Sequence, residues 1–460
     1  MHDSPFEPAL EIAARSAIRF LHKLNEDPVS AQASLQELRE RLGRPLSDGS
    51  VAAEEVIEEL VEDTRGGLVG SAGGRFFAWA IGGSVSAALA ADWLTSAWDQ
   101  NGAMYACSPA AAVVEEVVGG WLTDLLGLPK DCSFGLVSGC QMAHVTCLAA
   151  ARHELLSERG WDVERQGLAG APQIRVLASN RHGSIERAVR LLGIGEAQVE
   201  DLPLDTAEML RPEVLAAALE RTKGAPVIVI LQAGDLNTGS FDPFCELIPL
   251  AKGHAAWVHI DGAFGLWAAG SARYRHLLDG VEGADSWATD GHKWLNVPYD
   301  CGYAFVARPA PHRAALSHRA PYLAPNDDVR EEIDWNPEWS RRARGFATYA
   351  ALRQLGRVGI AALVDRCCEH ARTLVEGLGR LPGAEVLWSP VINQGLVRFR
   401  HDDHYTNRVI QRTLQHGGAF FAGTTWRGNR AMRVSVLNWQ TNEHDVEVAI
   451  QTVKACLEGD

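Results

Sequence analysis

Short β-rich runs alternate with helical stretches between residues 131 and 310 of this 460-residue chain, and no other feature limits the fold as strongly. Helical stretches such as residues 141–157 and 185–192 separate the runs. Such alternation predicts a mostly parallel sheet with helices on both faces, because parallel strands need long crossover connections. The runs cover residues 173–178, 226–231, 255–260, 286–289 and 302–306.

The regions outside this alternation have a different character. The first 70 residues look helical and contain amphipathic stretches. Residues 308–345 are rich in Arg, Pro, Asp and Trp and show little periodicity, which is typical of a functional or mobile connection. Helices and strand-like runs then resume. We therefore expect an N-terminal helical segment (1–70), a large domain (71–345) that ends in a functional or mobile loop (308–345), and a small C-terminal α/β domain (346–460).

Composition argues against several classes of protein. The chain has 58 acidic and 43 basic residues, and this net charge of −15 argues against a general binder of nucleic acids or anionic membranes. Nine scattered cysteines without a CxxC pair indicate reduced thiols rather than a disulfide framework or a zinc site. No secretory signal is visible at the N-terminus, and no run has the ~18 uninterrupted apolar residues of a membrane span. We expect a cytoplasmic protein without a metal, nucleic-acid or membrane partner.

Two charged residues at the ends of β-rich runs indicate the chemistry. Lys293 lies in an Asp-Gly-His-Lys-Trp segment, where lost hydration would make its amine easier to deprotonate, as a Schiff-base lysine requires. Taken alone, it would be a surface lysine that lies over an apolar patch. Asp261 ends a Trp-Val-His-Ile-Asp run and precedes small residues. A pyridoxal phosphate (PLP) enzyme needs both residues, because the lysine holds the aldehyde and the carboxylate keeps the pyridine nitrogen protonated.

Two further segments follow β-rich runs at the same predicted edge of the sheet. Gly139, Cys140 and Gln141 begin a helix, and a helix N-terminus suits a phosphate, although a plain helix cap gives the same pattern. His182 follows the run 173–178, where a histidine could stack on a flat cofactor or be an ordinary loop residue. The combination is more specific than any one segment.

The segments Ser-x-x-His-x-Ser, His-x-Asp-x-Ala and Asp-x-His-Lys-Trp, in this order, resemble those of the group II PLP-dependent amino-acid decarboxylases, which include the aromatic-L-amino-acid, glutamate and tyrosine decarboxylases. The resemblance runs from about residue 73 to the C-terminus. It implies the PLP-dependent transferase fold (fold type I), with a large seven-stranded, mostly parallel sheet domain, a smaller C-terminal α/β domain and an N-terminal helical segment. It also implies a homodimer with active sites at the subunit interface.

The resemblance assigns roles to matching residues. Lys293 would form the Schiff base with PLP, and Asp261 would pair with the pyridine nitrogen. His182 would stack on the ring and contact the substrate carboxylate, while Ala263 would pack on the opposite face. The remaining cofactor-binding residues would be Gly139, Cys140, Gln141, Asp290 and His292.

Two segments depart from the family pattern. The usual Gly-Gly-Ser/Thr-Glu-Ala segment reads Gly-Cys-Gln-Met-Ala at residues 139–143, so the hydroxyl donor to the phosphate is missing. The usual Gly-Thr-Thr segment reads Gly-Asp-Leu at residues 234–236. The acid at Asp235 could alter the polarity of the pocket in a way that the sequence does not define.

Tyr322 bears on which product leaves the enzyme. It follows Lys293 by 29 positions, in a Tyr-Leu pair at a place where aromatic-amino-acid decarboxylases carry the same pair on a mobile loop. The resemblance implies that its hydroxyl returns a proton to the substrate carbon after CO₂ leaves, and relatives with phenylalanine there form aldehydes. Its presence favours plain decarboxylation, and the alternative is an aromatic that only anchors a loop.

We expect the chain to decarboxylate an L-amino acid to the amine and CO₂. Trp79, Met104 and Tyr105 match substrate-pocket segments and favour an aromatic or otherwise apolar substrate, although Trp79 could equally belong to the core. Other reactions with the same cofactor remain open: aldehyde-forming decarboxylation, transamination or another lyase reaction. The alternative of another class is a PLP-fold protein that binds without catalysis.

Overall fold

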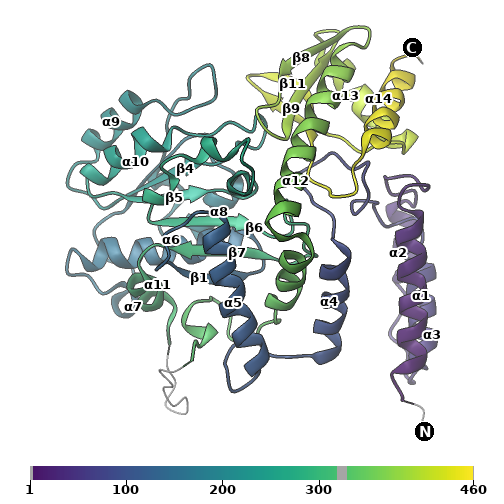
Figure 1. The fold of residues 1–460 in the computed structure, drawn as a ribbon, viewed down its shortest axis with the longest axis horizontal. Coiled ribbons are helices and arrows are strands. Elements are labelled where there is room, and N and C mark those ends of the chain that lie inside the picture. Colours follow the sequence, from purple (N-terminus) through teal and green to yellow (C-terminus); the bar gives the residue numbers. More distant parts are fainter. Residues whose placement is uncertain (1–3, 319–328, 459–460) are drawn as a thin grey trace.

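A seven-stranded sheet lies at the centre of the structure, and helices cover both of its faces (Figure 1). This computed structural model describes residues 4–318 and 329–458. The strands are β1 (Ser133–Val137), β2 (Arg175–Ala178), β3 (Val199–Asp201), β4 (Val227–Gln232), β5 (Trp257–Asp261), β6 (Ser286–Asp290) and β7 (Gly302–Val306). Their spatial order is β1-β7-β6-β5-β4-β2-β3. Strands β3, β2, β4, β5 and β6 pair in parallel and β7 is antiparallel to β6 and β1, which confirms the predicted sheet.

Both faces of the sheet are buried, because successive side chains of a strand point to opposite sides. In β4, Ile228 and Ile230 pack with α6 (Cys140–Ser157) and α8 (Gly183–Leu191). Val229 and Leu231 pack in the core on the other face. This double burial explains why such strands read as continuous apolar runs, and the five predicted runs match strands to within two residues. The edge strand β3 was not predicted, because its Val-Glu-Asp sequence is short and polar.

One helix corrects a prediction from the sequence. We expected an irregular connection throughout residues 308–345, but residues Pro309–Leu316 form α11. The prolines at 309 and 311 hide the helical pattern, yet both lie in the first turn, where amide donors have no partner within the helix. The helix packs on α6 and buries His312. The other helices of this part are α4 (Ser86–Trp98), α5 (Pro109–Leu125), α7 (Val163–Gln166), α9 (Pro212–Arg221) and α10 (Phe244–Gly253).

A four-stranded antiparallel sheet forms the small C-terminal α/β domain. Its order is β10-β11-β9-β8. The long helix α12 (Gly345–Gly379) packs on α4 and α5 and also on β9, so it joins the two sheets. The exact boundary at residue 345 stays a prediction. The elements are β8 (Ala384–Trp388), β9 (Gln394–Phe399), α13 (Asp403–His416), β10 (Ala422–Trp426), β11 (Asn429–Ser435) and α14 (Glu443–Glu458), and short 3-10 turns elsewhere cover Glu196–Gln198, Gly265–Gly270, Arg275–Leu278, Val281–Gly283 and Glu332–Asp334.

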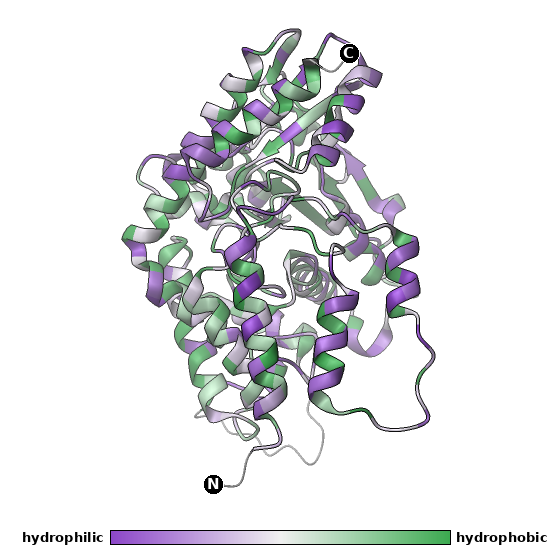
Figure 2. Ribbon diagram, turned by 90° about the vertical axis from the view of Figure 1, so that its right-hand side faces the viewer, coloured by the Kyte–Doolittle hydropathy of each residue, from purple (hydrophilic) through white to green (hydrophobic). Residues whose placement is uncertain are grey.

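The N-terminal helices stand apart from the two sheets (Figure 1). They are α1 (Glu7–Lys23), α2 (Leu35–Leu42) and α3 (Ala53–Asp63), and none of them has a fully buried residue. Apolar side chains such as Leu10 and Leu60 are more than half exposed, and green residues recur along these helices in Figure 2. Within the described ranges, no helix is long and apolar enough to cross a membrane.

Candidate active site

Three chain segments meet beyond the carboxyl ends of β1, β5 and β6. β1 is antiparallel to β7 and β7 is antiparallel to β6, so β1 and β6 end at the same edge of the sheet. Asp261 ends β5, Asp290 ends β6, and Lys293 follows three residues later. All three side chains are largely buried. The structure therefore brings the predicted lysine and carboxylates together where α/β sheets form their sites.

Lys293 is held by a carboxylate as well as by apolar contacts. Its Nζ lies 3.3 Å from Asp290 Oδ2 and 5.9 Å from the centre of the Phe264 ring. Burial lowers the pKa of Lys293, but the charges of Asp290 and Asp261 raise it, and the net result is a pKa above its usual value. The prediction that lost hydration would make this amine easier to deprotonate is therefore wrong, because nearby anions outweigh desolvation.

Asp290 connects the lysine loop to the start of α6. Cys140 N donates a hydrogen bond to Asp290 Oδ1 at 2.6 Å, and His292 Nε2 lies 3.3 Å from the same oxygen. Asp290 N donates to the carbonyl of Ala263 at 3.0 Å, which joins the ends of β5 and β6. Asp290 thus joins three other residues predicted to bind the cofactor and itself contacts Lys293.

The start of α6 is closely packed and contains an unsatisfied donor. A Cβ added to Gly139 would lie 3.0 Å from His292 Cε1, so a larger residue there would press on the His292 ring. Gln141 Nε2 is buried and has no hydrogen-bond partner among the described residues. Leaving a buried amide donor unpaired costs about 1–3 kcal/mol. This edge of the site therefore needs an acceptor that the neighbouring protein groups do not provide.

His182 lies at the exposed rim of the same site. It caps α8, where its Nδ1 accepts a hydrogen bond from Ser184 N at 3.2 Å. Its ring is open to solvent and within electrostatic reach of Asp261 and Lys293. The structure therefore groups His182 with the lysine and the aspartate, as predicted from their positions at strand ends.

Asp235 organises the loop that follows β4. Its Oδ1 accepts hydrogen bonds from Asn237 N at 2.9 Å and Thr238 N at 2.8 Å. Its Oδ2 accepts from Asn180 Nδ2, in the loop that carries His182. The acid at this departure from the family pattern therefore joins two loops of the site.

Arg433 reaches this region from β11 and was not predicted. Its side chain is buried, and its Nε lacks a hydrogen-bond partner within the part of the chain that the structure describes. Burial lowers the pKa of Arg433 to about 10 while Asp235 opposes the shift, so the guanidinium stays charged at neutral pH. It is also within electrostatic reach of His182. No local pattern marks this arginine, because only the packing of the small domain brings it here.

Trp79 lies on the surface beside the lysine loop. Its side chain is 53% exposed, which removes the alternative that it belongs to the core. Its ring packs edge-on against Phe420 at 5.3 Å between centroids. Three residues later, Gly82 N donates to the carbonyl of His292 at 3.3 Å, so this segment contacts the loop of Lys293.

The other proposed pocket residues lie near the segment that precedes α12. Met104 and Tyr105 are partly buried, and Tyr105 N donates to Glu331 Oε2 at 2.9 Å. Ile333 N donates to the carbonyl of Ala103 at 3.0 Å. Tyr322 lies outside the described residues, so its predicted role stays a prediction.

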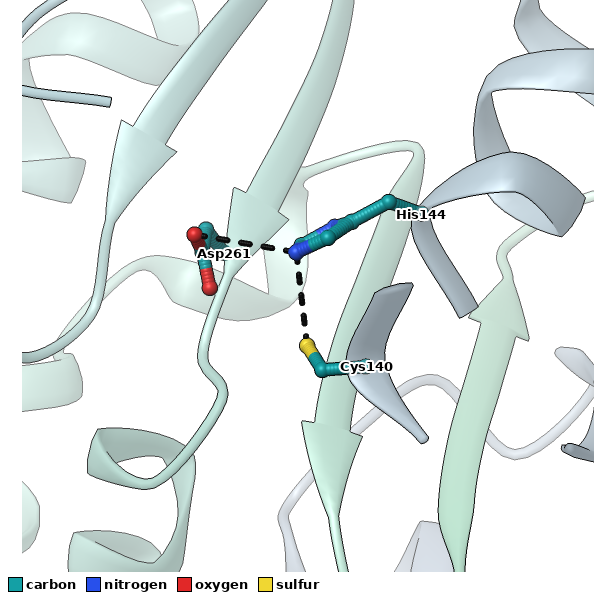
Figure 3. Close-up of side chains that lie close together, drawn as sticks. All are labelled: Cys140, His144 and Asp261. Carbon is teal, nitrogen blue, oxygen red and sulfur yellow. Dashed lines mark hydrogen bonds and ion pairs between the residues drawn. The ribbon is translucent and has the colours of Figure 1, made fainter. Parts of the chain in front are cut away.

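A second cluster lies directly beside Asp261 (Figure 3). Cys140, His144 and Asp261 are the set, among residues that the structure describes, whose donor atoms could hold a metal ion, and these atoms lie within 4.8 Å of one another. Cys140 Sγ lies 3.4 Å from His144 Nε2, which lies 3.7 Å from Asp261 Oδ2. Burial raises the pKa of the Cys140 thiol well above its usual value, so the thiol stays protonated and is a poor ligand. Cysteine spacing alone does not reveal this cluster.

Comparison with known proteins identifies the family. A family model described as the pyridoxal-dependent decarboxylase conserved domain matches residues 41–402. The chain belongs to the pyridoxal-dependent decarboxylase family. It is accordingly a PLP-dependent carboxy-lyase.

Relatives within the pyridoxal-dependent decarboxylase family cover most of the chain. An aromatic-L-amino-acid decarboxylase of Bacillus atrophaeus is 25% identical over 96% of this chain and 93% of its own length. A phenylacetaldehyde synthase of Petunia hybrida is 29% identical over 78% of this chain and 72% of its own length. A crystal structure of Oryza sativa TDC with PLP and tryptamine superposes with a TM-score of 0.91, covers 98% of this chain and 97% of that chain, and is 24% identical, which establishes fold type I.

The residues at the start of α6 fit the PLP that this family of decarboxylases uses. A phosphate would supply the acceptor that Gln141 Nε2 lacks, at a helix N-terminus whose dipole favours an anion. Gln141 would then take the place of the hydroxyl donor of the family pattern.

Gln141→Leu is expected to weaken PLP binding by about tenfold, because a hydrogen bond to a charged acceptor contributes about 1.5 kcal/mol or more. The dissociation constant can be measured by titrating PLP into the cofactor-free chain and following tryptophan fluorescence. Gln198→Leu is the matched control, because Gln198 accepts a hydrogen bond from Arg175 away from the site. Equal affinity of both variants and the parent chain would contradict the role of Gln141.

Proposed function

We propose that the chain decarboxylates an L-amino acid with an aromatic or otherwise apolar side chain to the corresponding amine. The observation that carries the proposal is the grouping of Lys293 with Asp261 at the ends of neighbouring strands, beside the N-terminus of α6. A single ligand with an aldehyde, a ring nitrogen and a phosphate could contact all three features. The relative named aromatic-L-amino-acid decarboxylase supports the substrate class.

Within this proposal, Lys293 holds PLP, Asp261 faces its ring nitrogen, and Gln141 donates to its phosphate. When bound, PLP supplies an aldehyde that bonds to an amine and a ring that takes up the electron pair released with CO₂. The chain's own contribution is electrostatic. Asp261 is buried with little competing solvent, so its negative charge acts strongly on a cationic ring nitrogen.

Arg433 and His182 are proposed to hold the substrate carboxylate before it leaves. Arg433 is a buried cation whose Nε has no partner within the described ranges, and His182 lies within its electrostatic reach. A guanidinium can bind a carboxylate through two parallel hydrogen bonds. These contacts would orient the bond to the carboxylate, while Trp79 and Phe420 offer an aromatic surface to an apolar side chain.

The test of this function is a screen of the standard L-amino acids with CO₂, amine, aldehyde and keto acid measured together. Release of amine and CO₂ in equal amounts from an aromatic amino acid is expected. Aldehyde formation deserves its own measurement, because the Petunia relative is a phenylacetaldehyde synthase. Keto acid as the main product would indicate transamination, and turnover of a charged amino acid alone would contradict the proposed substrate class.

Tyr322→Phe is expected to divert the product from amine to aldehyde. The change removes only the hydroxyl that we propose returns a proton to the substrate carbon, so the aromatic ring remains. Dissolved oxygen then has more time to accept two electrons and two protons, so that aldehyde, ammonia and hydrogen peroxide, with water supplying the aldehyde oxygen, replace part of the amine. The measurement is the amine-to-aldehyde ratio with oxygen present and absent. An unchanged ratio and rate would mean that Tyr322 only anchors a loop, and His182 would be the next candidate.

We also propose that two copies of the chain associate. The supporting observation is the exposed apolar surface of α1 and α3, where Leu10 is 59% and Leu60 is 51% exposed. Burial of such side chains contributes roughly 25 cal/mol per Å². Analytical ultracentrifugation is expected to show a dimer, and Leu10→Glu with Leu60→Glu should shift it toward monomer. A monomeric parent chain would contradict the proposal.

A further inference from the structure

A buried chain of polar groups leads away from Asp261 and is not used by the proposed mechanism. His144 Nε2 lies 3.7 Å from Asp261 Oδ2, and His144 Nδ1 lies 2.9 Å from His259 Nε2 (Figure 3 shows the first contact). His259 Nδ1 lies 2.9 Å from Ser286 Oγ. Trp257 Nε1 donates to the same hydroxyl at 2.9 Å. Both histidines and Ser286 are fully buried.

At the end of this polar network that is distant from Asp261, the side chains favour one direction for the hydrogen bonds. An indole N–H can only donate, so Ser286 Oγ accepts from Trp257, and its own hydrogen can be directed at His259 Nδ1. His259 Nε2 then carries the hydrogen that it donates to His144 Nδ1. In this arrangement a neutral His144 carries its hydrogen on Nε2, the atom that faces Asp261.

At the other end of the polar network, the contact of His144 with Asp261 favours the same direction of the hydrogen bonds. An N–H dipole directed at a buried carboxylate is attractive, whereas a nitrogen lone pair at the same place would be repelled. Burial lowers the pKa of His144 and of His259 to about 3, so both rings are neutral at ordinary pH and each has one hydrogen to place. The Nε2 hydrogen of His144 then faces Asp261 Oδ2 at 3.7 Å and Cys140 Sγ at 3.4 Å, and the carboxylate is the charged acceptor of the two.

We propose that His144 is a positioning residue, which directs its Nε2 hydrogen at Asp261 and so holds that carboxylate oriented toward the ring nitrogen of PLP. The inference rests on the proposed role of Asp261. Trp257, Ser286 and His259 fix the tautomer of His144 through the hydrogen bond at its Nδ1. The network acts on the cofactor through Asp261 and does not itself touch substrate.

The opposite tautomer would have a different consequence. With its hydrogen on Nδ1, His144 would turn a lone pair toward Cys140 Sγ and Asp261, and the three groups would suit a divalent cation such as Zn²⁺. Nε2 of His144 cannot carry a hydrogen and bind a cation at the same time, so the two arrangements exclude each other. Metal binding is therefore an alternative outcome of the test.

The test compares variants loaded with PLP that carries ¹⁵N in the ring, because the ¹⁵N chemical shift reports protonation of that nitrogen directly. His144→Phe keeps a ring but removes both nitrogens, and His144→Gln keeps an amide that can donate to Asp261. His312→Phe is the matched control, since His312 is equally buried beside Ser133 but lies outside the site. Asp261→Asn is measured in parallel.

In His144→Phe, the ring nitrogen is expected to lose its proton at a pH about one unit lower, with about tenfold weaker PLP binding, because the N–H dipole that faces the carboxylate at 3.7 Å is lost. His144→Gln should restore most of both values, and His312→Phe should leave them unchanged. If Asp261→Asn shifts the nitrogen but His144→Phe does not, only the role of His144 is wrong. If Asp261→Asn has no effect either, the proposed role of Asp261 fails first.

A second measurement does not depend on any variant. Histidine-selective ¹⁵N labelling of the cofactor-free chain assigns the tautomer of His144, and we expect the hydrogen on Nε2. A hydrogen on Nδ1, or a shift of that signal on addition of Zn²⁺ alone, would overturn the proposal in favour of a cation site.

Discussion

Replacing Lys293 with alanine is expected to abolish turnover, with a loss on the order of 10⁴-fold or more, as seen when an enzyme loses a group that bonds covalently during the reaction. The protein should remain folded, because Asp290 keeps its hydrogen bond from Cys140 N and its contact with His292 after the amine is gone. The measurements are amine release and the yield of a borohydride-reducible PLP adduct. Both should disappear together.

Lys252→Ala serves as the control for Lys293→Ala. Lys252 forms an ion pair with Asp285, at the opposite end of β6 from Lys293. This variant should keep the adduct and the rate of the parent chain. A reducible PLP adduct that persists in Lys293→Ala would show that another amine holds the cofactor.

Asp261→Asn is expected to slow turnover by about 10²-fold or more, which corresponds to about 3 kcal/mol of barrier. Asparagine has nearly the same shape and can keep the contact with Ala263 N, so the change removes mainly the negative charge. Without that charge the ring nitrogen is less basic and takes up electrons less well. The measurements are kcat with the best amino-acid substrate and the ¹⁵N shift of the bound ring.

Asp285→Asn is the matched control, because Asp285 is also a buried carboxylate. It accepts a hydrogen bond from Val258 N at 2.8 Å and lies away from the strand ends that form the site. Asp285→Asn therefore shows the effect of losing a buried negative charge on stability. Loss of the proton from the PLP ring nitrogen should occur only in Asp261→Asn. Near-normal turnover in Asp261→Asn would mean that another group supplies the charge.

The sequence by itself determined the central sheet and the residues at its middle. Runs such as 226–231 and 302–306 became β4 and β7, because a strand buried on both faces needs a continuous apolar run that is visible locally. Lys293 and Asp261 were recognisable because each lies in a short segment whose spacing is local. The helix α11 escaped the same reasoning, since its prolines conceal a pattern that becomes clear only when it packs on α6.

Only the tertiary structure decided which distant residues join Lys293 and Asp261. His144 and His259 are 115 positions apart and meet at 2.9 Å, and Arg433 arrives from a different sheet. The raised pKa of Lys293, opposite to the prediction from burial alone, also depends on the carboxylates that folding places beside it. The physical reason is that the order β1-β7-β6-β5 inserts late strands between early ones. Local periodicity determines which residues are buried, but the order of the strands determines which buried charges and hydrogen-bonding groups become neighbours.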